Sequence, residues 1–273
     1  MRKKLSLFVL TGLMFLLFQP HNIDAQAVKN EGKKAAIAAS LPPSVSNIAK
    51  ENTYPNAMQD MPYLQPGELA QQLINSSNVK IDNPKLIHIL NESAISSSPF
   101  SFGYRATIYL GHWALSYESS ETTSNWEYQR VNTNYFDNRG GNSPVKINYV
   151  QEAQKTVRGG LTAKIPATED VQKMMLAKAA EKSKLPLSFE THIGAGTKKD
   201  QIYNIPPNRL GYLYAHAPAV NEKGKVTYGE VYLKLRGKKR SIMVKNVTSQ
   251  GIGAWIPIQD HLSFSFMASG QPK

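Results

Sequence analysis

The chain has no cysteine among its 273 residues. A thiol nucleophile, a thiolate metal site and a cysteine-linked lipid anchor are therefore excluded, as is any disulfide that would stabilise a small core. Acidic residues are also scarce, because 20 Asp and Glu stand against 32 Lys and Arg, for a formal net charge of +12. The fold must be held by packing, and 41% apolar residues are enough to bury a sizeable core.

Long hydrophobic runs are lacking too, apart from one near the start. Arg2, Lys3 and Lys4 precede an apolar run over residues 5–18, and the small residues Ala25 and Ala27 follow it. This is the layout of a secretory signal, so we predict a signal peptide over residues 1–27 with cleavage after Ala27. The run is shorter than the roughly 20 residues that span a bilayer, and we expect a soluble exported protein, extracellular or attached to the cell envelope. The sequence leaves open whether the signal is cleaved or kept as an anchor.

The remaining chain divides into a tether and one domain. Residues 28–50 are rich in Lys, Ala and Ser, contain Pro42 and Pro43, and show no hydrophobic period, which predicts a flexible tether. Residues 51–273 are predicted to form a single β-rich domain with an N-terminal helical segment. Within it, residues 52–66 are too apolar for a free linker and should pack as an extended segment.

Three helices are predicted from apolar periodicity and capping residues. The first begins near Pro66, and the second has Asn83 as N-cap with Pro84 at its first position. The third begins with Thr168 as N-cap, carries an apolar stripe that includes Val171 and Met175, and should lie across a sheet.

From Phe102 onward the apolar period is mostly two, which predicts half-buried strands. Turn residues gather at 137–144, and two hairpins are predicted at 221–224 and 237–240. The predicted fold class is mostly β, that is β-rich α+β: an antiparallel sandwich or extended meander with a few short helices.

No catalytic or cofactor motif is present. Residues 194–199 lack the spacing of a phosphate-binding loop and predict a turn, and the five His beyond the signal show no local metal-ligand spacing. Glu118 and Glu121 sit among Ser and Thr and are interpreted as a solvated turn, and Asp260 beside His261 as a structural pair. We therefore predict no metal, no cofactor and no catalytic residue, and leave enzymatic activity open.

Positive charge is concentrated in one part of the chain. Between residues 196 and 245, eleven Lys and Arg face only three acids. The densest group surrounds the hairpin predicted at 237–240 and is the candidate anion-binding site: Lys234, Arg236, Lys238, Lys239, Arg240 and Lys245. Outside a cell, the partners that fit are anionic cell-wall polymers or lipid headgroups rather than nucleic acid. An ordinary solvated turn with edge-protecting lysines is the alternative.

Several blocks of the sequence resemble the YfkD-like family of exported proteins from Bacillus-type bacteria. They are NTYPNAMQDMPYLQP at 52–66, NYFDNRGGN at 134–142, LPLSFETHIGAGTKKDQIYNIPP at 185–207 and VTSQGIGAWIPIQDH at 247–261. The resemblance implies a Gram-positive envelope setting and brings no functional residues with it.

Three functions are compatible with the sequence. The leading hypothesis is a non-catalytic, envelope-associated binding module with a basic face for anionic envelope polymers. A β-structured membrane-active protein is the second, suggested by the Ser- and Thr-rich stretch 116–125. A hydrolase whose residues converge only in the fold is the third.

Overall fold

The computed structural model describes residues 41–57, 65–93 and 103–272. The predicted signal, its cleavage site at Ala27 and the tether up to residue 40 lie outside the described residues. The end of the predicted tether is part of the fold, which corrects its boundary: β1 (Val45–Asn47) pairs with a later strand and Ile48 is fully buried. Burying the apolar side chains of Val45 and Ile48 is more favourable than leaving them exposed to water in a free linker.

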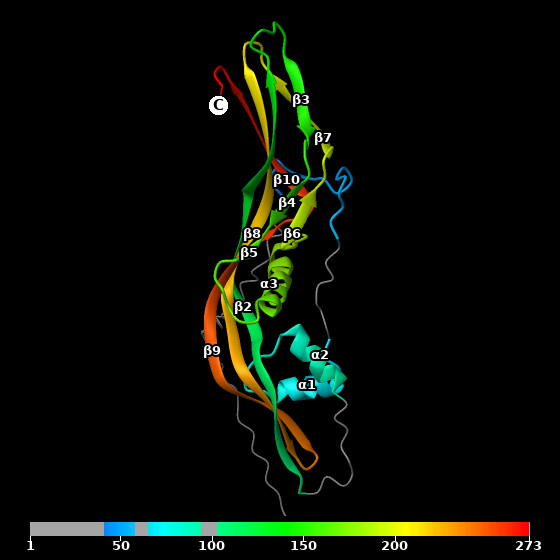
Figure 1. Cartoon of the computed structure of the whole chain (residues 1–273), viewed down its shortest axis with the longest axis vertical. Coiled ribbons are helices and arrows are strands. Elements are labelled where there is room, and N and C mark those ends of the chain that lie inside the picture. The colour runs from blue at the N-terminus through cyan, green and yellow to red at the C-terminus, as the bar shows by residue number, and fades with distance from the viewer. Residues whose placement is uncertain (1–40, 58–64, 94–102, 273) are drawn as a thin grey trace, which may run out of the picture. The chain divides into compact units, whose positions relative to one another are not determined.

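The main sheet is built along one 27-residue strand, β8 (Leu210–Arg236), and is antiparallel throughout (Figure 1). On one side of β8 lies the 33-residue strand β2, and on the other lie first β10 and then β9. Short strands β1 and β5 complete the outer edges. The bounds are Arg105–Asp137 for β2, Lys239–Pro257 for β9, His261–Ser269 for β10 and Gly160–Leu161 for β5.

The hairpin predicted at residues 221–224 does not exist, because β8 runs straight through these residues and is paired on both sides. Glu222 is fully buried there and accepts hydrogen bonds from Tyr117 and Thr122. Gly224 is needed for close approach rather than for a turn, since a Cβ at this position would lie 2.2 Å from the Glu118 carbonyl oxygen. Long-range packing has overridden the local turn signal.

Glu118 and Glu121 also lie in a strand, so the turn expected there is wrong. Both belong to β2, as does the Ser- and Thr-rich stretch 116–125, and a register shift between Ser119 and Glu121 accommodates the irregular sequence. Glu121 forms an ion pair of 2.8 Å with Lys223 on the neighbouring strand. The polar side chains thus make cross-strand contacts on an open part of the sheet.

Two short antiparallel ribbons pack on the end of the sheet that holds β10, which gives this end the character of a small sandwich. One ribbon pairs β3 (Val145–Val150) with β7 (Lys198–Ile205), and the other pairs β4 (Lys155–Arg158) with β6 (Glu190–Ile193). Their shared core with β8 and β10 includes Tyr149, Leu213 and Phe264. Both predicted turns survive here, at residues 138–144 and at Gly196 with its φ of +83°.

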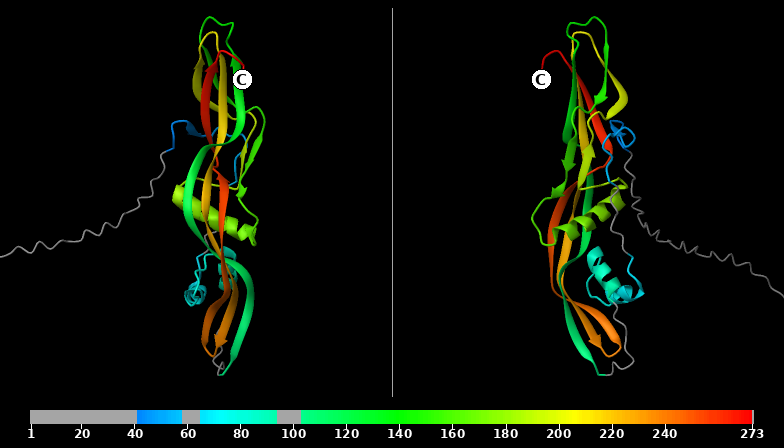
Figure 2. Two further views of the ribbon diagram at one scale, coloured as in Figure 1. Left: turned by 90° about the vertical axis from the view of Figure 1, so that its left-hand side faces the viewer. Right: turned by 45° about the vertical axis from the view of Figure 1, so that its right-hand side comes forward.

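The first two helices begin close to where they were predicted. Helix α1 (Glu68–Asn75) starts after Gly67, and α2 (Pro84–Glu92) starts after Asn83, whose side chain accepts from the backbone N–H of Lys85 and Leu86 at 2.9 and 3.1 Å. Figure 2 shows both helices beside the part of the sheet that ends in the β8–β9 hairpin. That hairpin turns at residues 237–238, as predicted, with Gly237 at φ +57°.

The third helix, α3 (Thr168–Ser183), packs on the middle of the sheet through the predicted stripe, which includes Val171 and Met175. Thr168, which was predicted as the N-cap, is instead the first residue of the helix. Ala167 occupies the N-cap position in a left-handed conformation, and the Thr168 hydroxyl donates to the Ile165 carbonyl at 2.9 Å. No helix among the described residues is long and apolar enough to cross a membrane.

The helices cover opposite faces of β8. The α3 cluster takes the even-numbered residues Val220, Val226 and Tyr228, whereas the α1–α2 cluster takes the odd-numbered Val231 and Leu233. Asn83, just before α2, donates to Asp170 of α3 at 3.2 Å, so the two groups of helices are neighbours. Since successive side chains of a strand point to opposite faces, however, their clusters use different local faces of this twisted sheet. This explains the unbroken buried run at residues 114–117 of β2, which the alternating pattern did not predict.

Candidate functional site

Five of the six predicted anion-binding residues lie near the end of the β8–β9 hairpin and Lys245 lies farther along β9, but the six do not share a face. Register pairs Arg236 with Lys239 and Lys234 with Ser241 on the side of the sheet away from α1 and α2. Arg240 pairs with Leu235 on the opposite side, and Lys238 lies in the turn. The predicted cluster therefore divides into a main group on one face and two flanking cations.

Pairing with β2 extends this face into four rows, which we call the platform. The rows are Arg105–Arg236–Lys239, Thr107–Lys234–Ser241, Tyr109–Tyr232–Met243 and His112–Glu230–Lys245. Arg105 was not among the predicted residues, since it lies 131 positions before Arg236 in the sequence and joins the cluster only through strand pairing. The platform holds five Lys and Arg against one carboxylate. None of the five forms an ion pair within the described residues.

Tyr232 is fixed at the centre of the platform by polar contacts. Its hydroxyl donates to Glu230 Oε2 at 2.7 Å, and this hydrogen bond lowers the pKa of the Glu230 carboxyl and raises that of the Tyr232 hydroxyl. The Lys245 ammonium lies 5.3 Å from the centroid of the Tyr232 ring, within the range of a cation–π contact. The ring of Tyr109, with a centroid 5.1 Å from that of Tyr232, is 55% exposed.

A cleft of about 460 Å³ adjoins the last row of the platform at His112. The N-terminus of α3 lines it with Thr168, Glu169 and Asp170, and Lys85 and Trp113 complete the wall. The His112 ring stacks on Tyr228 with centroids 6.0 Å apart. The cleft thus combines the two neighbouring carboxylates of α3 with an ammonium and an imidazole from other elements, which the sequence did not place beside them.

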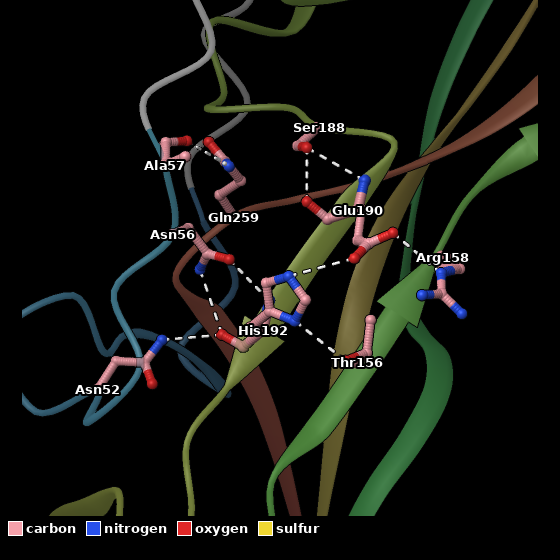
Figure 3. Close-up of polar contacts among 9 residues, drawn as sticks. All are labelled: Asn52, Asn56, Ala57, Thr156, Arg158, Ser188, Glu190, His192 and Gln259. Carbon is pink, nitrogen blue, oxygen red and sulfur yellow. Dashed lines mark hydrogen bonds and ion pairs between the residues drawn. The ribbon is translucent and has the colours of Figure 1, made fainter.

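A second polar cluster surrounds His192, on the β4–β6 ribbon (Figure 3). The His192 Nδ1 atom is 3.0 Å from the Thr156 hydroxyl, and Nε2 is 3.2 Å from Glu190 Oε1. The other Glu190 oxygen accepts from Arg158 at 2.9 Å, and this bond lowers the pKa of the Glu190 carboxyl. A carboxylate beside Nε2 favours a proton there, which leaves Nδ1 to accept from Thr156.

The segment at residues 52–57 packs against this ribbon as expected, while residues 58–64 lie outside the described residues. The Asn56 side chain accepts from the His192 backbone N–H at 2.6 Å and donates to the His192 carbonyl at 3.3 Å, so it imitates a neighbouring strand (Figure 3). Asn52 donates to the same carbonyl at 2.9 Å, and Asp260 Oδ1 accepts from Asn56 at 2.7 Å. Asp260 therefore helps to hold residues 52–57 in place. The His261 ring forms a separate hydrogen bond with the Gln259 carbonyl.

The hydroxyl, imidazole and carboxylate at His192 have the order used by nucleophilic hydrolases. They lie on a two-stranded ribbon, however, and line neither the cleft of about 460 Å³ at His112 nor a second cleft of about 440 Å³ beside α1. The hydrogen bonds between residues 52–57 and the same ribbon have a structural role, because they hold this segment in place. Among the described residues, no three His, Asp or Glu side chains converge as metal ligands.

Comparison with known proteins identifies the family of the chain. The model of the YfkD-like protein family matches residues 42–273. A protein of Bacillus subtilis (strain 168) named "Uncharacterized protein YfkD" is 58% identical over 268 residues, which cover 98% of this chain and 99% of that protein. The matched residues span the platform, the cleft at His112 and the polar cluster at His192. The chain therefore belongs to the YfkD-like protein family.

Proposed function

We propose that the chain is a non-catalytic binding module of the cell envelope, whose platform holds anionic envelope polymers or lipid headgroups by their phosphate or carboxylate groups. The observation that carries this proposal is the gathering of Arg105, Lys234, Arg236, Lys239 and Lys245 on one sheet face with a single carboxylate among them. Cations without a protein counterion gain most from an external anion. The signal predicted from residues 1–27 supports an envelope setting for the ligand.

The two flanking cations add positive charge to the same end of the molecule. Lys238 lies in the hairpin turn, and Arg240 points to the other face beside Leu235. Positive charge therefore surrounds the hairpin end on more than one side, and an approaching polyanion is attracted over a range set by the Debye length, about 10 Å at 0.1 M salt.

The test is binding of residues 28–273 to purified envelope fractions across a salt series. Bound protein should fall steeply between about 50 mM and about 500 mM NaCl, because added ions screen exposed charges. A variant with Lys234, Arg236 and Lys239 changed to Ser should lose most of the binding at low salt. The matched control changes Lys155, Lys164 and Lys198 to Ser, which are exposed cations elsewhere, and removes the same charge.

Three results would end the proposal. The first is binding that persists unchanged at high salt, and the second is no binding to any fraction. The third is equal loss of binding in the platform variant and in the control, because net charge rather than the platform would then be responsible.

The cleft beside His112 favours a second candidate function, hydrolysis of a small substrate. Its lining places Glu169, Asp170 and His112 around one concave space, as general acid–base chemistry requires. Turnover would be measured on ester, phosphoester and glycoside substrates with the unaltered chain and with His112→Ala. If the two proteins show the same rates on every substrate, this candidate is removed.

A further inference from the structure

The platform contains a feature that anion binding alone does not need. Tyr109 exposes 55% of its surface in the middle of the cations, between the rows of Lys234 and Lys245. Tyr232, beside it in the same row, is held by a hydrogen bond to Glu230, so the pair forms an aromatic surface that is fixed on one side. Exposed aromatic rings that are held in place by their neighbours are typical of recognition surfaces.

The order of groups across the platform restricts the kind of ligand. Cations at Arg236 and Lys239 come first, the Tyr109–Tyr232 pair follows, and Lys245 comes last. A sugar ring offers an apolar C–H face that packs on an aromatic ring, while anionic groups on the same chain reach cations to either side. A simple polyphosphate has no group that uses the tyrosine.

The cleft continues the platform in the same direction. His112 belongs both to the last platform row and to the cleft wall, where Trp113 supplies another aromatic ring and Lys85 another cation. The carboxylates of Glu169 and Asp170 in the same wall can accept hydrogen bonds from the hydroxyl groups of a sugar. An extended chain can lie along the rows and place a terminal unit in this cleft. A flat lipid surface cannot follow the platform into a concave space.

We propose that the platform binds an anionic glycan, with a sugar ring on Tyr109, its charged groups on Lys234, Arg236 and Lys239, and a terminal unit at the His112 cleft. This inference rests on the proposed function and names its ligand class. Tyr109 sets the preference for a glycan over other polyanions, and the cations supply the attraction that all polyanions share.

The experiment compares affinities for alginate, dextran, inorganic polyphosphate, single-stranded DNA and vesicles containing anionic phospholipid. The variant is Tyr109→Thr, which keeps a β-forming residue on β2. The matched control is Tyr135→Thr, because Tyr135 is 51% exposed on the same strand and contacts Tyr212 with centroids 5.1 Å apart. A Tyr109→Trp variant, which keeps an aromatic ring, adds a fluorescent reporter at the site.

We expect Tyr109→Thr to weaken alginate binding roughly three- to tenfold, as for the loss of one aromatic contact, and polyphosphate binding less than about twofold. Tyr135→Thr should change neither, and alginate but not polyphosphate should shift the emission of Tyr109→Trp. Equal losses for alginate and polyphosphate would overturn the inference. So would DNA or vesicles that bind more tightly than alginate and depend on Tyr109 as strongly.

Failure of this inference can be told from failure of the proposed function. If the Lys234, Arg236 and Lys239 variant loses binding but Tyr109→Thr does not, anion binding stands and the glycan preference falls. If the cation variant keeps its binding to every probe, both fall together.

Discussion

The Tyr117 hydroxyl donates a 2.9 Å hydrogen bond to Glu222 Oε1 inside the sheet, where Glu222 is fully buried. Burial and the neighbouring carboxylate raise the pKa of Tyr117, so the hydroxyl stays protonated as a donor. The Thr122 hydroxyl satisfies the other carboxylate oxygen at 2.6 Å. Two strands, β2 and β8, are thus joined by side chains as well as by their backbones.

Tyr117→Phe removes one of these donors and leaves the buried Glu222 Oε1 atom without this hydrogen bond. We expect the free energy of unfolding to fall by about 2 kcal/mol, the usual effect of losing a hydrogen bond to a charged group. Urea denaturation measures the change. In the Glu222→Gln background the same substitution should cost less, so equal costs in both backgrounds would contradict the proposed coupling.

Gly224→Ala should be strongly destabilising, although alanine is normally tolerated in a strand. The added Cβ would lie 2.2 Å from the Glu118 carbonyl oxygen and 2.5 Å from the Tyr117 hydroxyl, so β2 and β8 would have to separate. We expect a loss of about 3 kcal/mol. Gly140→Ala is the matched control, because no atom lies within 4 Å of its added Cβ, and its thermal unfolding should be nearly unchanged.

Acid should weaken the fold partly through His216, which is 8% exposed and whose Nδ1 has no partner within the described residues. Burial lowers the pKa of His216 below its ordinary 6.5, while Glu127 raises it and Arg130 lowers it. The unfolded chain therefore takes up the proton first as pH falls. Stability from the neutral imidazole is full above about pH 6.5 and is lost from there down through the folded-state pKa.

His216→Gln removes this titration and leaves the other groups in place. The difference in unfolding free energy between the unaltered chain and the variant should change below pH 6.5 and be constant above it. Denaturation at a series of pH values measures both proteins. A difference that stays constant across the whole range would show that His216 does not contribute.

Asn56→Ala should loosen residues 52–57 more than it lowers global stability. The substitution removes the pairing with both backbone groups of His192 and the bond to Asp260. We expect amide exchange at His192 to accelerate and global stability to fall by about 1 to 2 kcal/mol.

Asn56→Asp separates hydrogen bonding from size at this position. It keeps the acceptor for the His192 N–H but loses both donor bonds and brings a charge beside Asp260. It should therefore be more harmful than alanine at neutral pH. Better tolerance of aspartate than of alanine would mean that the docked segment is held by other contacts.

The sequence was informative where structure depends on neighbouring residues. Asn83 with Pro84 predicted the start of α2, and Gly237 predicted the hairpin, because a cap and a tight turn are set by a few adjacent residues. Residues 221–224 were misjudged because the strand there is maintained by Tyr117 and Gly224, which meet only across the sheet.

The same division applies to the candidate sites. The six cations near the hairpin could be predicted from their proximity in the chain, but Arg105 and the tyrosine pair required the register of β2 against β8. The His192 cluster joins residues about 140 positions apart, such as Asn52 and His192, and no local signal identified it. The apolar and charged patterns show which residue types lie near each other in the sequence. A site also depends on which strands pair, and these patterns do not determine the pairing.

The alternation of faces along β8 limits how this protein can change in length. An insertion of one residue between Tyr228 and Val231 would turn Leu233 toward solvent and Lys234 toward α1 and α2. An insertion of two residues would restore the original sides. Within this strand, an insertion or deletion of an odd number of residues should therefore be tolerated only where a β-bulge absorbs it, as β9 already does with an extra residue opposite Tyr228 and Glu230.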